Sequence, residues 1–580
     1  MNYSELVEAY QKIESTTKRL AMIDFLVELI RKTPSKIINK VVYLTQGKLY
    51  PDFLGIEIGM AEKMVIKSLS KATGVPENKI NNDLKKTGDL GETAKNFLKE
   101  AQKSLTIEEV FETLDKIAKT GGEGSVEKKI NLLAQLLNHA GSEEGKYIVR
   151  TVTSKLRLGI ADMTLIDALS IVYGGGKKNR DRIEAVYNKT SDLGTLAKKL
   201  AQGGLSGVEK MGITLGKPIR SMLCERLGDP EKILEKMNGR CAVEYKYDGE
   251  RVQIHKDGDK VVLFSRRLEN ITHQYPDIID LIKKHIIASK AILDAEVVVI
   301  NLETGEMRPF QDLMHRRRKH GIKKAIEDYP ISLFIFDLLF LDGEEMINKN
   351  YLERREKLKK VLKEGEQIRL AETKIVSNLK DLEEIFELSV EKGLEGLVCK
   401  SIEENSFYRA GARGWAWIKY KRDYKSEMIE PADLVIVGGF YGKGRRKSTY
   451  GALLLAAYDE ENDLFKTITK CGSGFTDQDL FSLPQKLKPY KISHKHPRVD
   501  SKLEPDQWFA PGLVIEVIGA ELTLSPVHTA GWNKLKKEAG IAIRFPRFTG
   551  RWRTDKSPED STTVDELIEM YKSQFKKIKK

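Results

Sequence analysis

The 580-residue sequence predicts a multidomain protein in which an all-α region precedes a mixed α/β domain and a small β-barrel. Three observations predict this order. Apolar residues recur at helical spacing up to about Leu215, β-rich runs begin after Gly216, and short strand-sized runs separated by glycines follow Lys421. Because so long a chain exceeds one ordinary core, we expect three domains, at residues 1–215, 216–422 and 423–580.

The first region has the spacing of amphipathic helices. One segment begins with a capping-box pattern, Thr106 to Glu109, and continues with apolar residues at helical spacing: Val110, Phe111, Leu114 and Ile117. Glycines at 121, 122, 124 and 174–176 mark the ends of helices. This region should be entirely helical.

The second and third regions carry strand-sized apolar runs. Those of the second region are Val261–Phe264, Ile292–Ile300, Leu333–Phe336 and Leu397–Cys399. Those of the third region are Leu434–Val437, Leu453–Tyr458 and Leu513–Ile518, and their Gly-rich turns favour a small barrel. A basic amphipathic helix is expected to close the chain, from Thr563 to Lys580.

The composition limits the partners and the compartment. Lys plus Arg outnumber Asp plus Glu by 98 to 85, a net charge of +13 that favours polyanionic partners, although a solvated basic surface explains it equally well. The four cysteines form no Cys-x-x-Cys pair, which argues against a zinc module or a disulfide framework. We see no signal peptide or membrane anchor and expect a cytoplasmic protein with no membrane partner.

The centre of the functional interpretation is a lysine, Lys246, which precedes an Asp-Gly turn in the segment 244–251. Alone, Lys-x-Asp-Gly is weak and fits an exposed hairpin equally well. Here it opens an ordered series of segments: Ser265–Arg267, Leu293–Glu296, Phe334–Asp337, Glu395–Lys400 and Trp417–Lys421. The whole series in this order is a much more specific signal than the tetrad.

This series resembles the covalent nucleotidyltransferase superfamily, which comprises DNA ligases, RNA ligases and mRNA capping enzymes. Two further segments, Arg544–Arg547 and Arg553–Lys556, look like the final motif of ATP-dependent DNA ligases. The segment 150–160 is similar to the helical DNA-binding domain of archaeal and eukaryotic replicative ligases. The resemblance implies a helical DNA-binding domain, an α/β adenylation domain and a C-terminal OB-fold domain.

The resemblance also implies a reaction, in which Lys246 takes AMP from ATP, passes it to the 5′-phosphate at a DNA nick, and the 3′-hydroxyl then displaces AMP. This activity serves DNA replication, repair and recombination. The implied cofactor is Mg²⁺, with Mn²⁺ as an alternative, and the implied partner is nicked double-stranded DNA. A sliding clamp is a further candidate partner, for which Gln102–Leu105 is a weak candidate segment, and a monomer in an archaeal-type cell is expected.

Lys246 must present a neutral amine to an α-phosphate, yet a free lysine is almost wholly protonated at neutral pH. Burial and nearby cations such as Arg251, Lys419 and Lys421 would favour the neutral form, so we expect a lowered pKa for Lys246.

The resemblance assigns nucleotide contacts to several residues. Glu244, two positions before Lys246 on a strand, shares its face. In the family the matching Glu or a neighbouring backbone group reads the adenine edge, against the alternative of a surface charge at the end of a strand. Phe336 matches the aromatic that stacks on adenine, against the alternative of an ordinary core residue. Arg251 and Arg266 match residues that contact the phosphate or the ribose.

A third arginine near the phosphates is expected at Arg413, with Arg409 as a competing choice. Lys419 and Lys421 share one face of a strand and could stabilise charge on the α-phosphate, although a lysine-rich edge strand is the plain alternative. Glu296 and Glu395 are the candidate Mg²⁺ ligands, and Glu296 could instead hold the ribose.

In the family, residues of the final motif orient pyrophosphate, which here implies Arg553, Asp555 and Lys556. The basic runs Arg316–Lys319 and Lys443–Lys447 are consistent with phosphate contacts along a duplex, although such runs are usually solvated surface.

Three alternatives remain. An mRNA guanylyltransferase or RNA ligase shares the core motifs but not the flanking regions. An NAD-dependent ligase carries a zinc module, which these cysteines cannot supply. A non-catalytic DNA-binding protein with the same fold would be expected to have lost some of the motifs.

Overall fold

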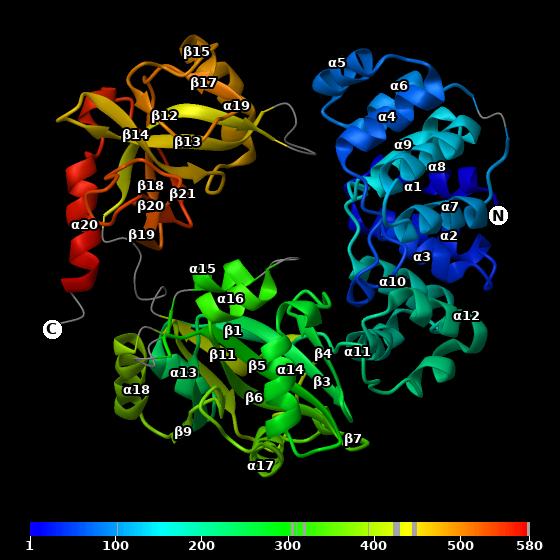
Figure 1. Ribbon diagram of the computed structural model, residues 1–580, viewed down its shortest axis with the longest axis horizontal. Helices are drawn as coiled ribbons and strands as arrows, with labels where there is room; N and C mark the ends of the chain where they lie inside the picture. Colours follow the sequence, from blue (N-terminus) through cyan, green and yellow to red (C-terminus); the bar gives the residue numbers. More distant parts are fainter. Residues whose placement is uncertain are drawn as a thin grey trace. The chain divides into compact units, whose positions relative to one another are not determined.

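The computed structural model describes residues 1–100, 103–302, 307–308, 310–316, 321–392, 394–421, 430–442 and 449–576. The chain divides into two compact units, Met1–Tyr420 and Lys421–Lys580 (Figure 1). The division of the first unit at residue 215 stays a prediction. The two basic-run segments 317–319 and 443–447, and Gln102 of the candidate clamp segment, lie outside the described residues.

The N-terminal part of the first unit is helical, as predicted. Its α-helices are α1 (Tyr3–Glu14), α2 (Arg19–Lys32), α3 (Ile38–Thr45), α4 (Glu62–Thr73), α5 (Glu77–Thr87), α6 (Leu90–Phe97), α7 (Ile107–Lys119), α8 (Ser125–His139), α9 (Ser142–Val152), α10 (Asp162–Val172), α11 (Arg180–Thr190) and α12 (Leu193–Glu209). The predicted capping box is confirmed, because Thr106 and Glu109 each accept a backbone hydrogen bond from the other at the start of α7.

The rest of the first unit mixes helices with two sheets (Figure 1). The five-stranded sheet has the order β1 (Leu223–Arg226), β11 (Arg413–Lys421), β10 (Gly396–Ser401), β2 (Cys241–Lys246) and β9 (Thr373–Val376). The six-stranded sheet contains β4 (Lys260–Ser265), β3 (Glu250–Asp257), β5 (Lys290–Val299), β6 (Ile331–Leu341), β7 (Glu344–Glu345) and, beside β6, β8 (Ile368–Leu370). The helices are α13 (Pro230–Lys236), α14 (Pro276–His285), α15 (Phe310–Leu313), α16 (Ile322–Asp328), α17 (Tyr351–Val361) and α18 (Leu379–Glu391).

Each sheet has one apolar face and one face that carries the charged residues of the motifs. In β2, Cys241 and Val243 pack into an apolar cluster, so the alternate residues Glu244 and Lys246 face the other way. In β3, Val252 and Ile254 pack into a second cluster, which leaves Arg251 on the opposite face. The turn between β2 and β3 links the two sheets and places the motif residues between them.

The second unit is rich in strands and ends in a helix. Its elements are β12 (Ala432–Tyr441), β13 (Tyr450–Asp459), β14 (Leu464–Cys471), α19 (Asp477–Leu487), β15 (Lys491–Ile492), β16 (Val499–Asp500), β17 (Gln507–Phe509), β18 (Val514–Ile518), β19 (Glu521–Ser525), β20 (Gly540–Arg544), β21 (Arg547–Trp552) and α20 (Val564–Lys576). An antiparallel sheet built around β12, β13 and β14 surrounds the apolar core. The predicted order of fold classes is thus confirmed.

None of the described helices is both long enough and apolar enough to cross a membrane.

Candidate active site

Lys246 ends β2, and the turn after it leaves no room for a side chain at Gly249. A Cβ atom at Gly249 would lie 2.2 Å from the carbonyl oxygen of Val297 and 2.9 Å from Cγ of Glu296. Both distances are shorter than real carbon contacts, and the first obstacle is backbone of β5, which cannot easily shift. The glycine of the Lys-x-Asp-Gly tetrad therefore lets the turn approach the strand that carries Glu296.

Lys246 is held as an ammonium by carboxylates. Its Nζ lies 2.8 Å from Oε2 of Glu395, which precedes β10, and Gly396 pairs with Lys246 across the β2–β10 ladder. Burial alone would lower the pKa of Lys246, but the charges of Glu395 and Glu296 outweigh burial and raise it. The expected lowering of this pKa was therefore wrong for the ligand-free chain, because the predicted cations are not its closest charged partners.

Glu296 and Glu395 form a pair of carboxylates beside Lys246. Burial raises the pKa of Glu296 to about 7, with Glu395 adding to the rise and Lys246 and Arg251 opposing it. Such mutual repulsion is relieved by a cation. Among the described residues, no three histidine, cysteine, aspartate or glutamate side chains converge as a metal site. Two carboxylates nonetheless fit Mg²⁺, which commonly takes one or two protein carboxylates together with nucleotide phosphates.

Glu244 lies in a buried ionic cluster. Its carboxylate is 2.7 Å from Nζ of Lys400 and accepts a 2.6 Å hydrogen bond from the Tyr351 hydroxyl. Only 3% of Glu244 and 1% of Lys400 is exposed. The Lys400 ammonium also lies 4.4 Å from the ring centre of Trp417 and 5.0 Å from that of Phe336. Lys400 thus links Glu244, with which it forms an ion pair, to the ring of Phe336.

Arg251 is oriented by three partners. Its NH2 donates to Oδ2 of Asp294 at 2.6 Å and to the Tyr408 hydroxyl at 2.9 Å, and its NH1 donates to the carbonyl of Met222 at 3.0 Å. Its Nε is buried and has no hydrogen-bond partner among the described residues. The guanidinium also lies 5.2 Å from the ring centre of Phe336. A buried unpaired donor beside an aromatic ring suits a nucleotide oxygen.

Aromatic rings form one wall of this region. Phe336 meets Trp417 edge to face at 6.2 Å, and Phe334 stacks on Tyr247 at 4.0 Å. Trp417 lies on the opposite face of β11 from the core residues Ile418 and Tyr420. Lys419 and Lys421 alternate with those core residues and therefore share the face of Trp417.

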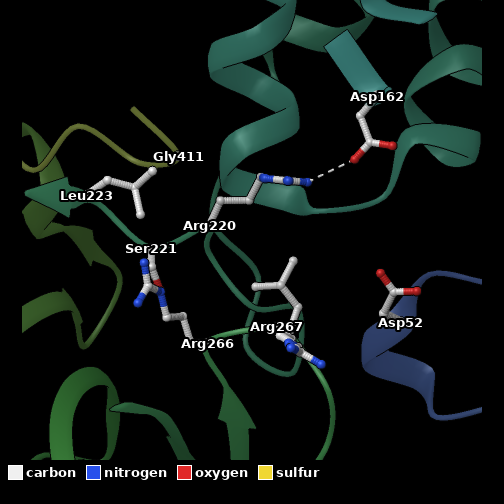
Figure 2. A pocket seen from close by; sticks show the side chains of 9 residues that line it. Asp52, Asp162, Arg220, Ser221, Leu223, Arg266, Arg267 and Gly411 are labelled. Atoms are coloured by element: carbon white, nitrogen blue, oxygen red, sulfur yellow. Dashed lines mark hydrogen bonds and ion pairs between the residues drawn. The ribbon is translucent and has the colours of Figure 1, made fainter. Parts of the chain in front are cut away.

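Arg266 and Arg413 are both exposed. Arg266 lines a pocket of about 210 Å³ with Arg220, Arg267 and Asp162, where Arg220 and Asp162 form an ion pair of 3.2 Å (Figure 2). Arg413 begins β11 and pairs with Leu223 of β1, which also lines this pocket. The structure thus associates Arg266 with Arg220 rather than with Arg251.

The second unit carries the remaining candidates at its surface. Arg553 forms a two-bond pair with the carboxylate of Asp555, at 3.0 and 2.7 Å. Arg553 also pairs with Asp433 of β12, and Nζ of Lys556 lies 2.8 Å from the same Asp433 oxygen. The three predicted residues therefore form one cluster, and Asp433, which the sequence did not single out, holds two of them.

Sequence reasoning also missed Asp294, Lys400 and Tyr408. Asp294 and Lys400 lie inside segments of the motif series, and Tyr408 lies between its last two segments, one residue before Arg409. Their roles in holding Glu244 and Arg251 depend on strand register, which the motifs do not reveal.

Comparison with known proteins identifies three family regions. Residues 2–170 match the DNA ligase N terminus, residues 221–421 match the ATP dependent DNA ligase domain, and residues 446–556 match the ATP dependent DNA ligase C terminal region. Together these regions cover most of the chain.

Close relatives match over their whole length. The chain is 54% identical to "DNA ligase 2" of Thermofilum pendens, over 99% of this chain and 98% of that protein. It is 50% identical to "DNA ligase" of Staphylothermus marinus, over all of both chains. A solved structure titled "Pmar-Lig_Pre." shares the fold, with a TM-score of 0.57 and 19% identity over 95% of this chain and 99% of that one. The chain belongs to the ATP-dependent DNA ligase family.

Proposed function

We propose that this chain seals nicks in double-stranded DNA and that Lys246 is the residue that carries AMP. The observation that supports this most strongly is the contact of the Lys246 amine with Glu395, together with the charge of Glu296 acting on it, at a turn whose Gly249 cannot accept a side chain. Such a turn gives the amine an approach to a bound phosphate from a fixed direction.

Three displacements complete the reaction. Nζ of Lys246 attacks the α-phosphorus of ATP, the bond to pyrophosphate breaks, and the amine loses its proton. The 5′-phosphate at the nick then displaces the lysine and takes AMP. Finally the 3′-hydroxyl attacks that activated phosphate, and AMP leaves with the electron pair of the broken bond.

The described side chains supply the binding groups. Phe336 offers a ring for the base, Glu244 an acceptor at the base edge, and Arg251 a guanidinium for phosphate or ribose oxygens. Lys419 and Lys421 share the face of β11 that carries Trp417, where their ammonium groups would stabilise charge on the α-phosphate. Arg266 and Arg413 are exposed and would serve phosphates from the surface.

Glu296 and Glu395 would hold Mg²⁺, or Mn²⁺, together with the nucleotide phosphates. The ion would neutralise charge on the α-phosphate and on pyrophosphate. Because Glu395 keeps Lys246 protonated in the ligand-free chain, any cation that takes Glu395 as its partner favours the neutral, nucleophilic amine.

Arg553 and Lys556 would exchange their bonds to Asp433 for bonds to pyrophosphate, with Asp555 holding Arg553 in position. The proposed partner is nicked duplex DNA, and the basic net charge is consistent with it. A sliding clamp as partner, a monomeric state and a cytoplasmic location in an archaeal-type cell complete the proposal.

Labelling with α-³²P-ATP and Mg²⁺, followed by denaturing electrophoresis, tests this assignment. The wild-type chain and the control Lys260→Ala, an exposed lysine in β4, should take up label. Lys246→Ala should not, because it removes the amine that attacks ATP, whereas Lys400 is paired with Glu244 and Lys419 and Lys421 are assigned to stabilise charge on the α-phosphate. Label in Lys246→Ala would remove this lysine from its role, and preferential labelling by GTP would favour a guanylyltransferase.

A further inference from the structure

Three polar side chains, two of them fully buried, follow one face of β3. They are Arg251, Gln253 and His255, which alternate along the strand, and Gln253 and His255 are 4% and 2% exposed. The β3–β5 register places Asp294 directly opposite Gln253. The proposed mechanism uses Arg251 but gives no task to the other two.

These groups form one continuous chain of hydrogen bonds. The backbone N–H of Gly216 lies 3.1 Å from Nδ1 of His255, whose Nε2 lies 3.0 Å from Oε1 of Gln253. Nε2 of Gln253 is 3.3 Å from Oδ1 of Asp294, and Oδ2 of Asp294 accepts from Arg251. This series of hydrogen bonds therefore runs from the segment that precedes β1 to the guanidinium of Arg251 in the proposed nucleotide site.

The direction of every bond in this chain is fixed. Because the Gly216 amide can only donate, Nδ1 of His255 accepts and its Nε2–H donates to Gln253. The same Gln253 oxygen accepts from the Ile219 amide at 2.7 Å, and the Gln253 nitrogen donates to the Ile219 carbonyl at 3.0 Å. Burial lowers the pKa of His255 to about 3, which keeps the ring in this neutral form.

The hydrogen bonds at the Arg251 end of this series also have fixed directions. The Tyr408 hydroxyl donates to Oδ2 of Asp294 at 2.7 Å and accepts from Arg251 and from the Met222 amide. Met222 lies three residues after Ile219, and its carbonyl accepts the remaining bond from Arg251. The segment 219–222 is thus held at one end by Gln253 and at the other by Arg251 and Tyr408.

We propose that Gln253 is a positioning residue for nucleotide binding, because it fixes Asp294 and the segment 219–222, which together orient the Arg251 guanidinium. This rests on the proposed role of Arg251 in holding ATP. Without the Gln253 amide, Asp294 loses its only donor outside the Arg251–Tyr408 group among the described residues, and the Ile219 backbone loses both bonds. Arg251 would then sample several orientations, which weakens ATP binding more than it slows the chemical step.

The main test measures the single-turnover rate of AMP transfer to the full chain at varied ATP concentration. Gln253→Leu nearly keeps the volume and removes the side-chain amide, with both its oxygen acceptor and its NH2 donor. It should raise the ATP concentration for half-maximal rate about tenfold and leave the rate at saturating ATP within about threefold. The matched control is Lys256→Met, which removes a buried cation from the opposite face of β3, where Lys256 donates to Ile286 and Ala288. That control should change the ATP dependence by less than about twofold.

A double-mutant cycle separates positioning from general destabilisation. In an Arg251→Met background, adding Gln253→Leu should shift the ATP concentration for half-maximal rate by less than about twofold. Gln253 acts on ATP binding through the Arg251 guanidinium, which this background lacks. Tyr408→Phe, which removes a single hydroxyl, should act in the same direction as Gln253→Leu and covers the case in which the latter fails to fold.

The outcomes are distinguishable. Equal shifts from Gln253→Leu and Lys256→Met, full additivity with Arg251→Met, or an unchanged ATP dependence in Tyr408→Phe would each overturn the positioning role. Failure of the wild-type chain to take AMP at Lys246 would instead overturn the proposed function on which it rests.

Discussion

The charged residues around Lys246 and those around Arg553 are held in different ways. The first group comes from separate strands of two sheets, and its supporting residues Lys400 and Asp294 are 1% and 0% exposed. The second group lies within four residues of one surface segment, where the side chains of Arg553 and Asp555 are 24% and 63% exposed. Asp433 is the shared partner of Arg553 and Lys556.

This difference separates two tasks. Buried groups with partners from several strands keep their geometry before any ligand arrives, as in-line attack on a phosphate requires. Exposed cations that share one carboxylate can exchange that carboxylate for a ligand anion at low cost. We therefore expect substitutions in the first group to lower both the rate of AMP transfer and the free energy of unfolding. Substitutions in the second group should slow self-adenylylation only.

Gly249→Ala should have the largest effect on the first group. Its Cβ would overlap the Val297 carbonyl and push the turn away from β5, so AMP transfer to Lys246 should fall at least about a hundredfold. The measurement is the single-turnover labelling rate. Gly121→Ala, where a Cβ meets nothing within 4 Å, is the control. A loss below about threefold would show that the close approach of this turn is unnecessary.

Lys400→Met should destabilise the first unit by about 3 kcal/mol, because it leaves the buried Glu244 carboxylate without its closest cation. Lys556→Met removes a surface cation and should cost less than about 1 kcal/mol. Chemical unfolding compares the two variants. Similar losses would contradict the contrast between buried and exposed charges, and Glu244→Gln should recover part of the Lys400→Met loss.

Asp555→Ala and Lys556→Ala should slow self-adenylylation about tenfold and sealing of a pre-adenylylated nick less than about threefold, because pyrophosphate takes part only in the first step. Two assays on one preparation measure both rates. Equal losses in the two assays would argue that the segment serves all steps alike.

The smallest effect concerns acid stability. Burial holds the pKa of His255 at about 3, below the value near 6.5 of an unfolded chain, so the unfolded state binds the proton first. The stabilisation is present above pH 6.5 and declines as the pH falls below it, by about 1 kcal/mol between pH 7 and pH 5.5. His255→Gln should flatten this part of the unfolding profile.

His528 of the second unit, whose pKa burial lowers to about 4, should behave like His255 in the same pH range. Because protonation of Glu296, whose pKa burial raises to about 7, stabilises the fold in the same range, the test is the difference between variants. Equal slopes for the wild type and His255→Gln between pH 7 and pH 5.5 would contradict the His255 assignment.

The sequence predicted what depends on local pattern. Helical spacing and the Thr106 capping box predicted the helical region, and the ordered motifs predicted Lys246, Glu296 and Glu395 as one set. The contacts within the site depend instead on strand pairing. The β2–β10 register brings Glu395 to Lys246 and Lys400 to Glu244, and neither pairing can be read from the order of the motifs.

The expected pKa of Lys246 was wrong for the same reason. The motif series led us to expect Arg251, Lys419 and Lys421 near Lys246, whereas the carboxylates that raise its pKa come from β5 and from the residue before β10. Gln253 gave no signal at all, because its importance comes from a hydrogen bond to Asp294 across β3 and β5.

Mapping the site of the AMP adduct tests whether Lys246 alone carries AMP. The full chain is incubated with ATP and Mg²⁺, digested under conditions that preserve a phosphoramidate, and analysed by mass spectrometry. The account predicts one AMP per chain, on the peptide that contains Lys246. AMP on any other residue, or a folded chain that forms no adduct, would contradict it.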